Sequence, residues 1–218
     1  MSTYKGIKGF KVQSLSADPV PSTVGWASGG SMNTGRRELG AANQAPGHSA
    51  GLIFGGYKSP AGPTNATEEY NGTSWTSSNN MTTSRQRLAG AGIQTAGLAF
   101  GGGYPPTAHS ETEEYDGSSW TNGGGLGTAR GRLGGSGTQT AGLAFGGSTV
   151  AEPPSKTNAT EEYDGSSWTA GGVLSVSRFM LGGGGTQTSA IAFGGNTNPP
   201  PARTDATEEY GGTSWTTG

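Results

Sequence analysis

The sequence contains the same unit four times, and this repetition limits what the chain can fold into. Three markers recur in a fixed order: FGG, then EEY, then a tryptophan five residues after the tyrosine. The FGG triplets begin at Phe54, Phe100, Phe145 and Phe193. The EEY triplets begin at Glu68, Glu113, Glu161 and Glu208, and the tryptophans are Trp75, Trp120, Trp168 and Trp215. Successive markers lie 45 to 48 residues apart, which is typical of architectures whose units bury their apolar faces against one another.

Each unit has the pattern of four short antiparallel strands, here named A to D. Strand A follows an Arg-x-x-Leu motif, strand B ends at Gly-Gly, strand C contains EEY, and strand D starts near the tryptophan. Between strands C and D stand Asn71-Gly72, Asp116-Gly117, Asp164-Gly165 and Gly211-Gly212. Such pairs predict two-residue type I′ turns with positive φ at both positions. No segment has a sustained helical period, so four strands per unit predict β-propeller blades.

The arginine before strand A, Gly-Gly after B, tyrosine in C and tryptophan in D resemble the kelch repeat. The resemblance covers residues 36–217 and implies an all-β, kelch-type β-propeller with four recognisable four-stranded blades. We expect these blades at about 36–79, 85–123, 130–171 and 178–217. The glycine- and threonine-rich strand A and the two glutamates of strand C depart from the usual kelch pattern.

Residues 1–21 lie outside the repeat and form a predicted leader, followed by the propeller at residues 22–218. Two interpretations stay open for the leader: a frayed edge strand, or an attachment segment that orders on a partner assembly. The opening YKGIKGFKVQSLSADP, followed by Gly/Thr-rich repeats, resembles tail-associated proteins of marine bacteriophages. That resemblance implies an oligomeric virion protein, of the tail fibre or associated with the tail, attached to other virion proteins through its N-terminal segment. A bacterial cell surface or secreted location is the alternative.

Residues 22–30 resemble a fifth strand D, because VGWASGG matches the SSWTAGG that begins at Ser166. Each of the four blades already has its own strand D, so this extra strand is left over. Three solutions stay open: a degenerate fifth blade completed by the N-terminal segment, a longer array whose final blade takes Trp26, or pairing with a neighbouring subunit. We favour a five-position ring closed by the N-terminal segment.

Bulk composition excludes several classes of function. The net charge of −2 gives no general attraction to nucleic acid. The absence of cysteine excludes a disulfide scaffold and cysteine chemistry. No run of 18 apolar residues predicts a membrane span. The 43 glycines and 30% hydrophobic residues resemble low complexity, but the ordered recurrence of Phe, Leu, Tyr and Trp argues against disorder.

Antiparallel connectivity places the D–A and B–C connections on one face and the A–B and C–D turns on the other. The B–C segments, which vary most, are Tyr57–Asn65, Gly103–Ser110, Ser148–Asn158 and Asn196–Asp205. Because specificity usually lies in variable loops on a fixed scaffold, we expect the first face to bind a host surface glycan or a neighbouring virion protein. The candidate contacts are Tyr57, Lys58, Tyr104, His109, Asn198 and Arg203.

The repeated charges are expected to form structural ion pairs, because a charge in a strand stack needs a partner to offset desolvation. The arginines are Arg36, Arg85, Arg130 and Arg178, and the glutamates assigned to them are Glu69, Glu114, Glu162 and Glu209. Rings of carboxylates that bind Ca²⁺ are the alternative. Consecutive glutamates of a strand point to opposite faces, which disfavours the converging oxygens that Ca²⁺ needs. We therefore expect no metal and no cofactor.

The sequence predicts no catalytic residues. Copper-radical oxidases share the propeller architecture, but their chemistry resembles a Cys–Tyr cross-link with histidine ligands, and the only histidines are His48 and His109. Glycosidases need two carboxyl groups roughly 5–9.5 Å apart. The acids outside the repeat lie in different units: Asp18, Glu38, Glu111, Glu152 and Asp205. A polysaccharide-degrading glycosidase or lyase on the same scaffold is the alternative function.

Two further expectations concern packing. Only strands with small side chains fit where blades converge, so the A-strand glycines should be innermost; they are Gly90, Gly92, Gly134, Gly135, Gly137 and Gly182 to Gly185. The four repeat tryptophans should be structural, largely buried between blades, because they follow the turns of the constant face.

Overall fold

Twenty short strands make up the regular structure of the computed structural model. It describes residues 29–218 except 45–46, 48, 105–106, 150–154 and 198–201. Within these residues there is no helix, and therefore none long and apolar enough to cross a membrane. The strands form four four-stranded antiparallel sheets and two two-stranded hairpins. The prediction of an all-β fold is confirmed.

The four large sheets follow one another along the chain. Sheet 1 comprises β1 (Gly40–Ala42), β2 (Gly51–Phe54), β5 (Thr67–Tyr70) and β6 (Trp75–Ser78). Sheet 2 comprises β7 (Ala89–Ile93), β8 (Ala96–Phe100), β11 (Thr112–Tyr115) and β12 (Trp120–Gly123). Sheet 3 comprises β13 (Gly134–Gly137), β14 (Gly142–Phe145), β15 (Thr160–Tyr163) and β16 (Trp168–Ala170). Sheet 4 comprises β17 (Gly182–Gly185), β18 (Ala190–Phe193), β19 (Thr207–Tyr210) and β20 (Trp215–Thr217). Each sheet thus holds the predicted strands A to D in that spatial order.

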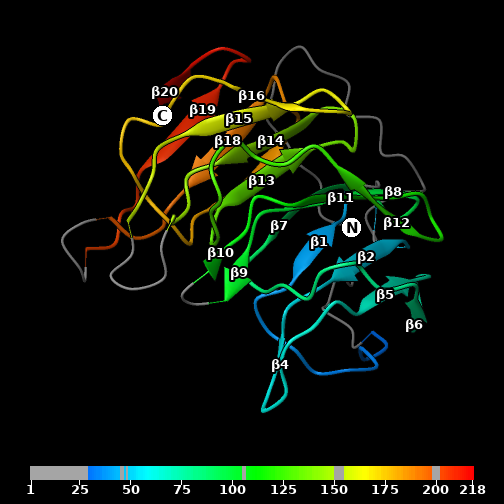
Figure 1. Ribbon diagram of the computed structural model, residues 1–218. Coiled ribbons are helices and arrows are strands. Elements are labelled where there is room, and N and C mark those ends of the chain that lie inside the picture. The colour runs from blue at the N-terminus through cyan, green and yellow to red at the C-terminus, as the bar shows by residue number, and fades with distance from the viewer. Residues whose placement is uncertain (1–28, 45–46, 48, 105–106, 150–154, 198–201) are drawn as a thin grey trace, which may run out of the picture.

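The A strands lie side by side at the inside of the array. Strand β7 packs against both β1 and β13, and β17 packs against β13. The other strands of each sheet follow outward, which gives the propeller-like arrangement of Figure 1. Glycine permits this approach: a Cβ atom on Gly135 would lie 2.8 Å from the ring of Phe100 and 3.1 Å from the carbonyl oxygen of Gly90. The innermost position predicted for the glycine-rich strands is therefore confirmed.

Aromatic side chains fill the space between neighbouring sheets. The FGG phenylalanine of one sheet contacts the tryptophan of the next in the pairs Phe54–Trp120, Phe100–Trp168 and Phe145–Trp215, with ring centroids 4.9 to 5.1 Å apart. These three phenylalanines are fully buried. Trp120 is buried, whereas the other three repeat tryptophans are only half-buried. Trp120, Trp168 and Trp215 therefore pack between sheets as expected, whereas the ring contact of Trp75 is with Tyr70 of its own sheet. Of the four, only Trp120 is as buried as predicted.

The turns between strands C and D differ from the prediction. In the register, Tyr115 is opposite Trp120, so four residues rather than two form the turn. Positive φ occurs at Gly117 but not at Asp116. The Asp116 Oδ1 atom accepts hydrogen bonds from the backbone N–H groups of Ser119 (2.7 Å) and Ser118 (2.8 Å). These bonds lower the pKa of Asp116 to about 2. An Asx turn of this kind stabilises the longer loop, so the type I′ prediction is wrong.

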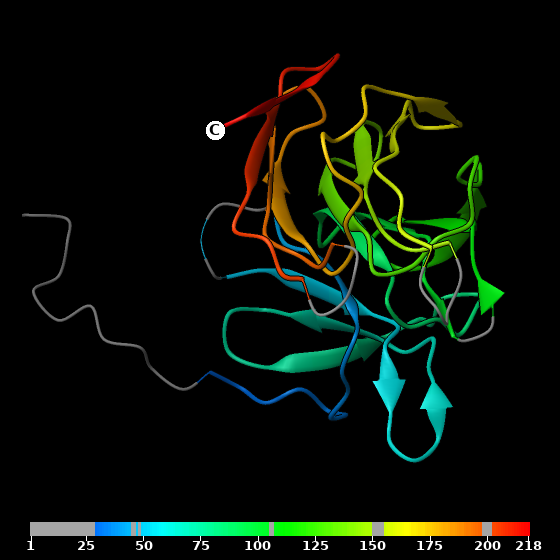
Figure 2. The same ribbon diagram turned by 90° about the vertical axis from the view of Figure 1, so that its left-hand side faces the viewer.

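Two small hairpins, which the repeat pattern did not predict, lie in the B–C connections. Strand β3 (Tyr57–Lys58) pairs with β4 (Gly62–Pro63), and β9 (Gly103–Tyr104) pairs with β10 (Thr107–Ala108). The β3–β4 hairpin stands out from the body of the protein in Figure 2 (cyan). The predicted leader and residues 22–28 of the predicted extra strand lie outside the described residues.

Replacement of Gly135 by valine should lower the free energy of unfolding by roughly 1–3 kcal/mol, because the new side chain overpacks a closed space. Urea denaturation measures this change. The matched control is Gly184→Val, on the corresponding strand of sheet 4, since a Cβ there meets no atom within 4 Å. Equal destabilisation by both substitutions would contradict the packing described for strand β13.

Candidate functional site

A buried ion pair connects the start of strand A to strand C in every sheet. In sheet 2, Arg85 Nη2 lies 2.8 Å from Glu113 Oε1, and both side chains are fully buried. The equivalent pairs are Arg36–Glu68, Arg130–Glu161 and Arg178–Glu208. Burial lowers the pKa of Arg85, and the charge of Glu113 opposes this shift. The prediction of structural ion pairs is correct, but it chose the wrong glutamate: Glu69, Glu114, Glu162 and Glu209 do not contact these arginines.

The second glutamate of each EEY motif points to the opposite face of its strand, as strand alternation requires. There it accepts a hydrogen bond from a tyrosine of the next sheet. The Tyr163 hydroxyl donates to Glu114 Oε1 at 2.5 Å, Tyr115 donates to Glu69, and Tyr210 donates to Glu162. Glu209 is the exception and has no such partner within the described residues. Three of the four second glutamates therefore join neighbouring sheets instead of binding arginine.

The repeated carboxylates do not converge on a common point. The first glutamate of each pair also accepts a backbone N–H bond from the D–A connection, as Thr82 N–H donates to Glu113 Oε2 at 2.6 Å. Within the part of the chain that the structure describes, no group of three His, Cys, Asp or Glu residues could hold a metal ion. The first three EEY pairs are thus engaged in structural hydrogen bonds, and only Glu209 is left over.

The predicted binding residues occupy the B–C connections of different sheets. Tyr57 and Lys58 form strand β3, and Tyr104 lies on β9. His109 Nδ1 lies 3.1 Å from Glu111 Oε2, and Arg203 is exposed. The residues share one face, here called the loop face, which consists of the B–C and D–A connections. They do not form a single cluster, and Asn198 lies outside the described residues.

Four residues at the inner end of the loop face have left-handed backbone conformations: Glu38, Arg87, Arg132 and Met180, with φ between 55° and 60°. Each is the third residue of an Arg-x-x-Leu motif. The N–H of Arg87 donates to the carbonyl of Glu38, that of Arg132 to Arg87, and that of Met180 to Arg132, each at 2.8 Å. This ladder holds a backbone conformation that costs about 1–3 kcal/mol per residue and directs the four side chains to one place.

These side chains surround a hollow where the A strands begin. Together with three leucines they enclose about 190 Å³, and the lining residues are Glu38, Leu39, Arg87, Leu88, Arg132, Leu133 and Met180. Arg87 Nε pairs with Glu38 Oε2 at 3.1 Å, and both remain partly exposed. The sequence carries a signal for this hollow: the two residues inside Arg-x-x-Leu are Arg-Glu, Gln-Arg, Gly-Arg and Phe-Met in the four units. They vary between constant neighbours, as the B–C loops do.

Cationic side chains gather on the loop face. Outside the buried ion pairs, the lysines and arginines of the described residues are Arg37, Lys58, Arg87, Arg132, Lys156 and Arg203. All six belong to D–A or B–C connections. The A–B and C–D turns in the described ranges contain no lysine or arginine, and they carry Asp116 and Asp164. The two ends of the sheets therefore differ in charge.

Several of these cations lie against aromatic rings. The Arg37 guanidinium is 4.7 Å from the centre of the Tyr57 ring. Arg132 and Lys156 lie 5.5 Å and 5.8 Å from the Phe179 ring. Stacking of an arginine on a ring orients the guanidinium while leaving hydrogen-bond donors at its edge able to reach a ligand. Arg37 and Arg132 therefore add to the candidate contacts named from the sequence, whereas the Phe179 ring and the Lys156 amine are buried.

The sequence matches no model of a known protein family and no curated protein. The kelch resemblance consequently rests on the repeated residues of this chain.

The tyrosine–glutamate contacts predict how stability depends on alkaline pH. Burial, together with the hydrogen bond to Glu69, raises the pKa of Tyr115 to about 12. Burial and Glu162 likewise raise the pKa of Tyr210 to about 12, and Tyr163 is shifted in the same direction. Since the unfolded chain loses these protons near pH 10, their stabilising effect should be complete below pH 10. It should be lost as the pH rises to about 12.

Thermal melts from pH 9 to 12.5 test this prediction. The triple variant Tyr115→Phe, Tyr163→Phe, Tyr210→Phe should be less stable at pH 9 and should lose less stability above pH 10 than the unmodified protein. Tyr70→Phe serves as the control, because no glutamate of a preceding sheet receives the Tyr70 hydroxyl in the described residues. Identical pH profiles of the triple variant and the unmodified protein would contradict the assignment.

Proposed function

We propose that this chain is a kelch-type β-propeller that acts as a non-enzymatic binding protein. Four repeats of arginine, Gly-Gly, tyrosine and tryptophan support the kelch type, and each repeat coincides with one four-stranded sheet. In this proposal the sheets are blades, and the loop face is the recognition surface.

The observation that carries the proposal is the concentration of variable residues and cations on one face. Six lysines and arginines, none of them in the buried ion pairs, share the loop face with the Tyr57 ring. Aromatic rings can pack against the apolar face of a sugar while their polar edges remain solvated. Arginine and lysine bind carboxylate or sulfate groups. A host surface glycan that carries acidic groups therefore fits this face better than a neutral one.

A virion location completes the proposal. It is supported by the resemblance of the leader and the Gly/Thr-rich repeats to tail-associated phage proteins. The N-terminal segment would then attach the protein to neighbouring virion proteins, while the loop face contacts the host. Glycan binding by a bacterial surface protein would use the same residues.

A glycan array tests the binding function. We expect binding to acidic glycans that weakens as salt rises. The double variant Arg37→Ala, Lys58→Ala should weaken it by about tenfold or more, which corresponds to ~1.4 kcal/mol. The matched control is Thr95→Ala, an exposed residue of the opposite face, and it should leave binding unchanged.

The same glycans, incubated with the protein and assayed for new reducing ends, decide between binding and catalysis. Steady release of reducing ends would assign the chain to the polysaccharide-degrading class and overturn the proposal. Equal loss of binding in the Thr95→Ala control would place the ligand away from the loop face.

A further inference from the structure

Neighbouring sheets meet through the same four contacts each time. Between sheets 3 and 4, Phe145 contacts the Trp215 ring, and Trp215 Nε1–H donates to Thr160 Oγ1 at 2.9 Å. The Tyr210 hydroxyl donates to Glu162, and the Gln187 side chain donates to the carbonyl of Tyr163 at 2.7 Å. The equivalent groups make the same contacts between sheets 1 and 2 and between sheets 2 and 3. One face of a sheet therefore supplies phenylalanine, threonine, glutamate and a carbonyl, and the next sheet supplies their partners.

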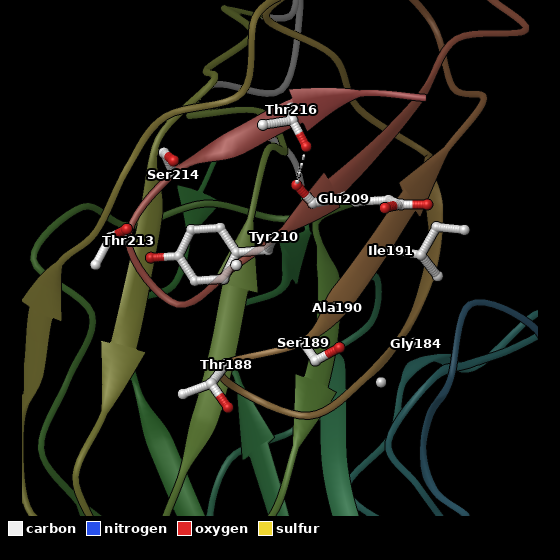
Figure 3. Close-up of a pocket in the computed structure, with 12 residues that line it drawn as sticks. Gly184, Thr188, Ser189, Ala190, Ile191, Glu209, Tyr210, Thr213, Ser214 and Thr216 are labelled. Atoms are coloured by element: carbon white, nitrogen blue, oxygen red, sulfur yellow. Dashed lines mark hydrogen bonds between the residues drawn. The ribbon is translucent and has the colours of Figure 1, made fainter.

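Sheet 4 presents the first of these faces with nothing against it. Phe193 is 48% exposed, whereas the three equivalent phenylalanines are fully buried. Ile191 is 39% exposed, whereas Leu143 at the same position is fully buried. The Glu209 carboxylate has no partner within the described residues. A hollow of about 630 Å³ lies over this face, and Figure 3 shows Ile191 and Glu209 beside it.

At the other end of the array, residues 29–33 contact sheet 1 in the way that a D–A connection contacts the next sheet. A Cβ on Gly30 would lie 2.3 Å from the carbonyl oxygen of Thr73, and one on Gly124 would lie 2.2 Å from that of Ser166. Gly124 directly follows strand D of sheet 2. In addition, Asn33 N–H donates to Glu68 Oε2 at 2.6 Å, as Gly127 N–H does to Glu161 Oε2. Residues 29–33 thus occupy the position, beside sheet 1, of a connection that leaves a strand D.

Residues 29–33 lie beside sheet 1 where the connection after the strand D of a neighbouring sheet would lie. Sheet 4 is not that neighbour, because its own strand D is β20. Trp26 precedes Gly29 by three residues, as Trp120 precedes Gly123. Within the described residues, sheets 1 and 4 are linked by the Gln44 side chain, which donates to the carbonyl of Gly185 at 2.7 Å. No strand of sheet 1 packs extensively against a strand of sheet 4 in the part of the chain that the structure describes, as expected where one sheet of a propeller-like array is missing.

We propose that the open face of sheet 4 binds one further copy of the repeat, through the three-stranded A–B–C segment of that copy. The occupant needs a glycine-rich strand A against Phe193, a glutamine for the carbonyl of Tyr210 and an EEY tyrosine for Glu209. The surface is distinct from the loop face, so this assignment does not depend on the proposed glycan binding.

A fusion protein tests the proposal. A second copy of residues 172–210 is joined after Gly218. Gly218 follows Trp215 by three residues, as Gly171 follows Trp168, so the appended copy continues the chain as residues 172–210 continue it after sheet 3. The fusion should unfold in one transition, with a melting temperature raised by roughly 5 °C or more. Phe193→Ala should reduce this gain in the fusion and should change little in the original chain, where the Phe193 side chain is 48% exposed. A control fusion, whose appended copy has phenylalanine for the EEY tyrosine and alanine for the turn glutamine, should gain less.

Three results would overturn the proposal. The first is a fusion that melts at the original temperature while protease removes the appended copy. The second is an original chain that is already a dimer, and that Ile191→Glu converts to a monomer, because a second copy would then cover the face. The third is loss of stability on deletion of residues 1–21 that Glu209→Gln reproduces, because the leader would then be the occupant.

Discussion

The contact between the phenylalanine of one sheet and the tryptophan of the next is the interaction on which the rest of the structure depends. A single sheet of this chain has three- to five-residue strands rich in glycine and threonine, and it cannot bury an apolar core alone. Phe100 becomes fully buried only because Trp168 and the glycines of strand β13 lie against it. Stability is therefore a property of the interfaces between sheets.

Buried polar groups give these interfaces their register. The Trp168 Nε1–H bond to Thr112 and the Tyr163 bond to Glu114 both cross from sheet 3 to sheet 2. A shift by one residue would bring the opposite face of a strand to the interface and leave these groups unpaired, which costs about 1–3 kcal/mol for each. Within a sheet, the Arg85–Glu113 pair fixes strand C to the loop face. The contacts between sheets thus require the same residues in every repeat, whereas the connections of the loop face are free to vary.

The sequence predicted what the repetition determines and missed what depends on single side chains. Four sheets, their strand order and the inner glycine-rich strands follow from FGG, EEY and tryptophan. The sequence did not show whether Glu113 or Glu114 pairs with the arginine, because either of two consecutive strand residues can face it until the register is known. The C–D turn was mispredicted because the Asp116 side chain competes with the two-residue hairpin. The ladder of Glu38, Arg87, Arg132 and Met180 was missed because these residues differ in type and none is glycine. Their shared place in Arg-x-x-Leu therefore does not indicate a left-handed conformation.

Hydrogen–deuterium exchange, measured strand by strand with mass spectrometry, tests most directly whether the interfaces hold the sheets. Strands β13 to β16 are covered by sheets on both sides, whereas β17 to β20 are covered on one side. Because protection reflects local opening, the account predicts that β18 and β19 exchange at least about tenfold faster than β14 and β15. Equal protection of the two sheets would contradict it, since each sheet would then be stable without its neighbour.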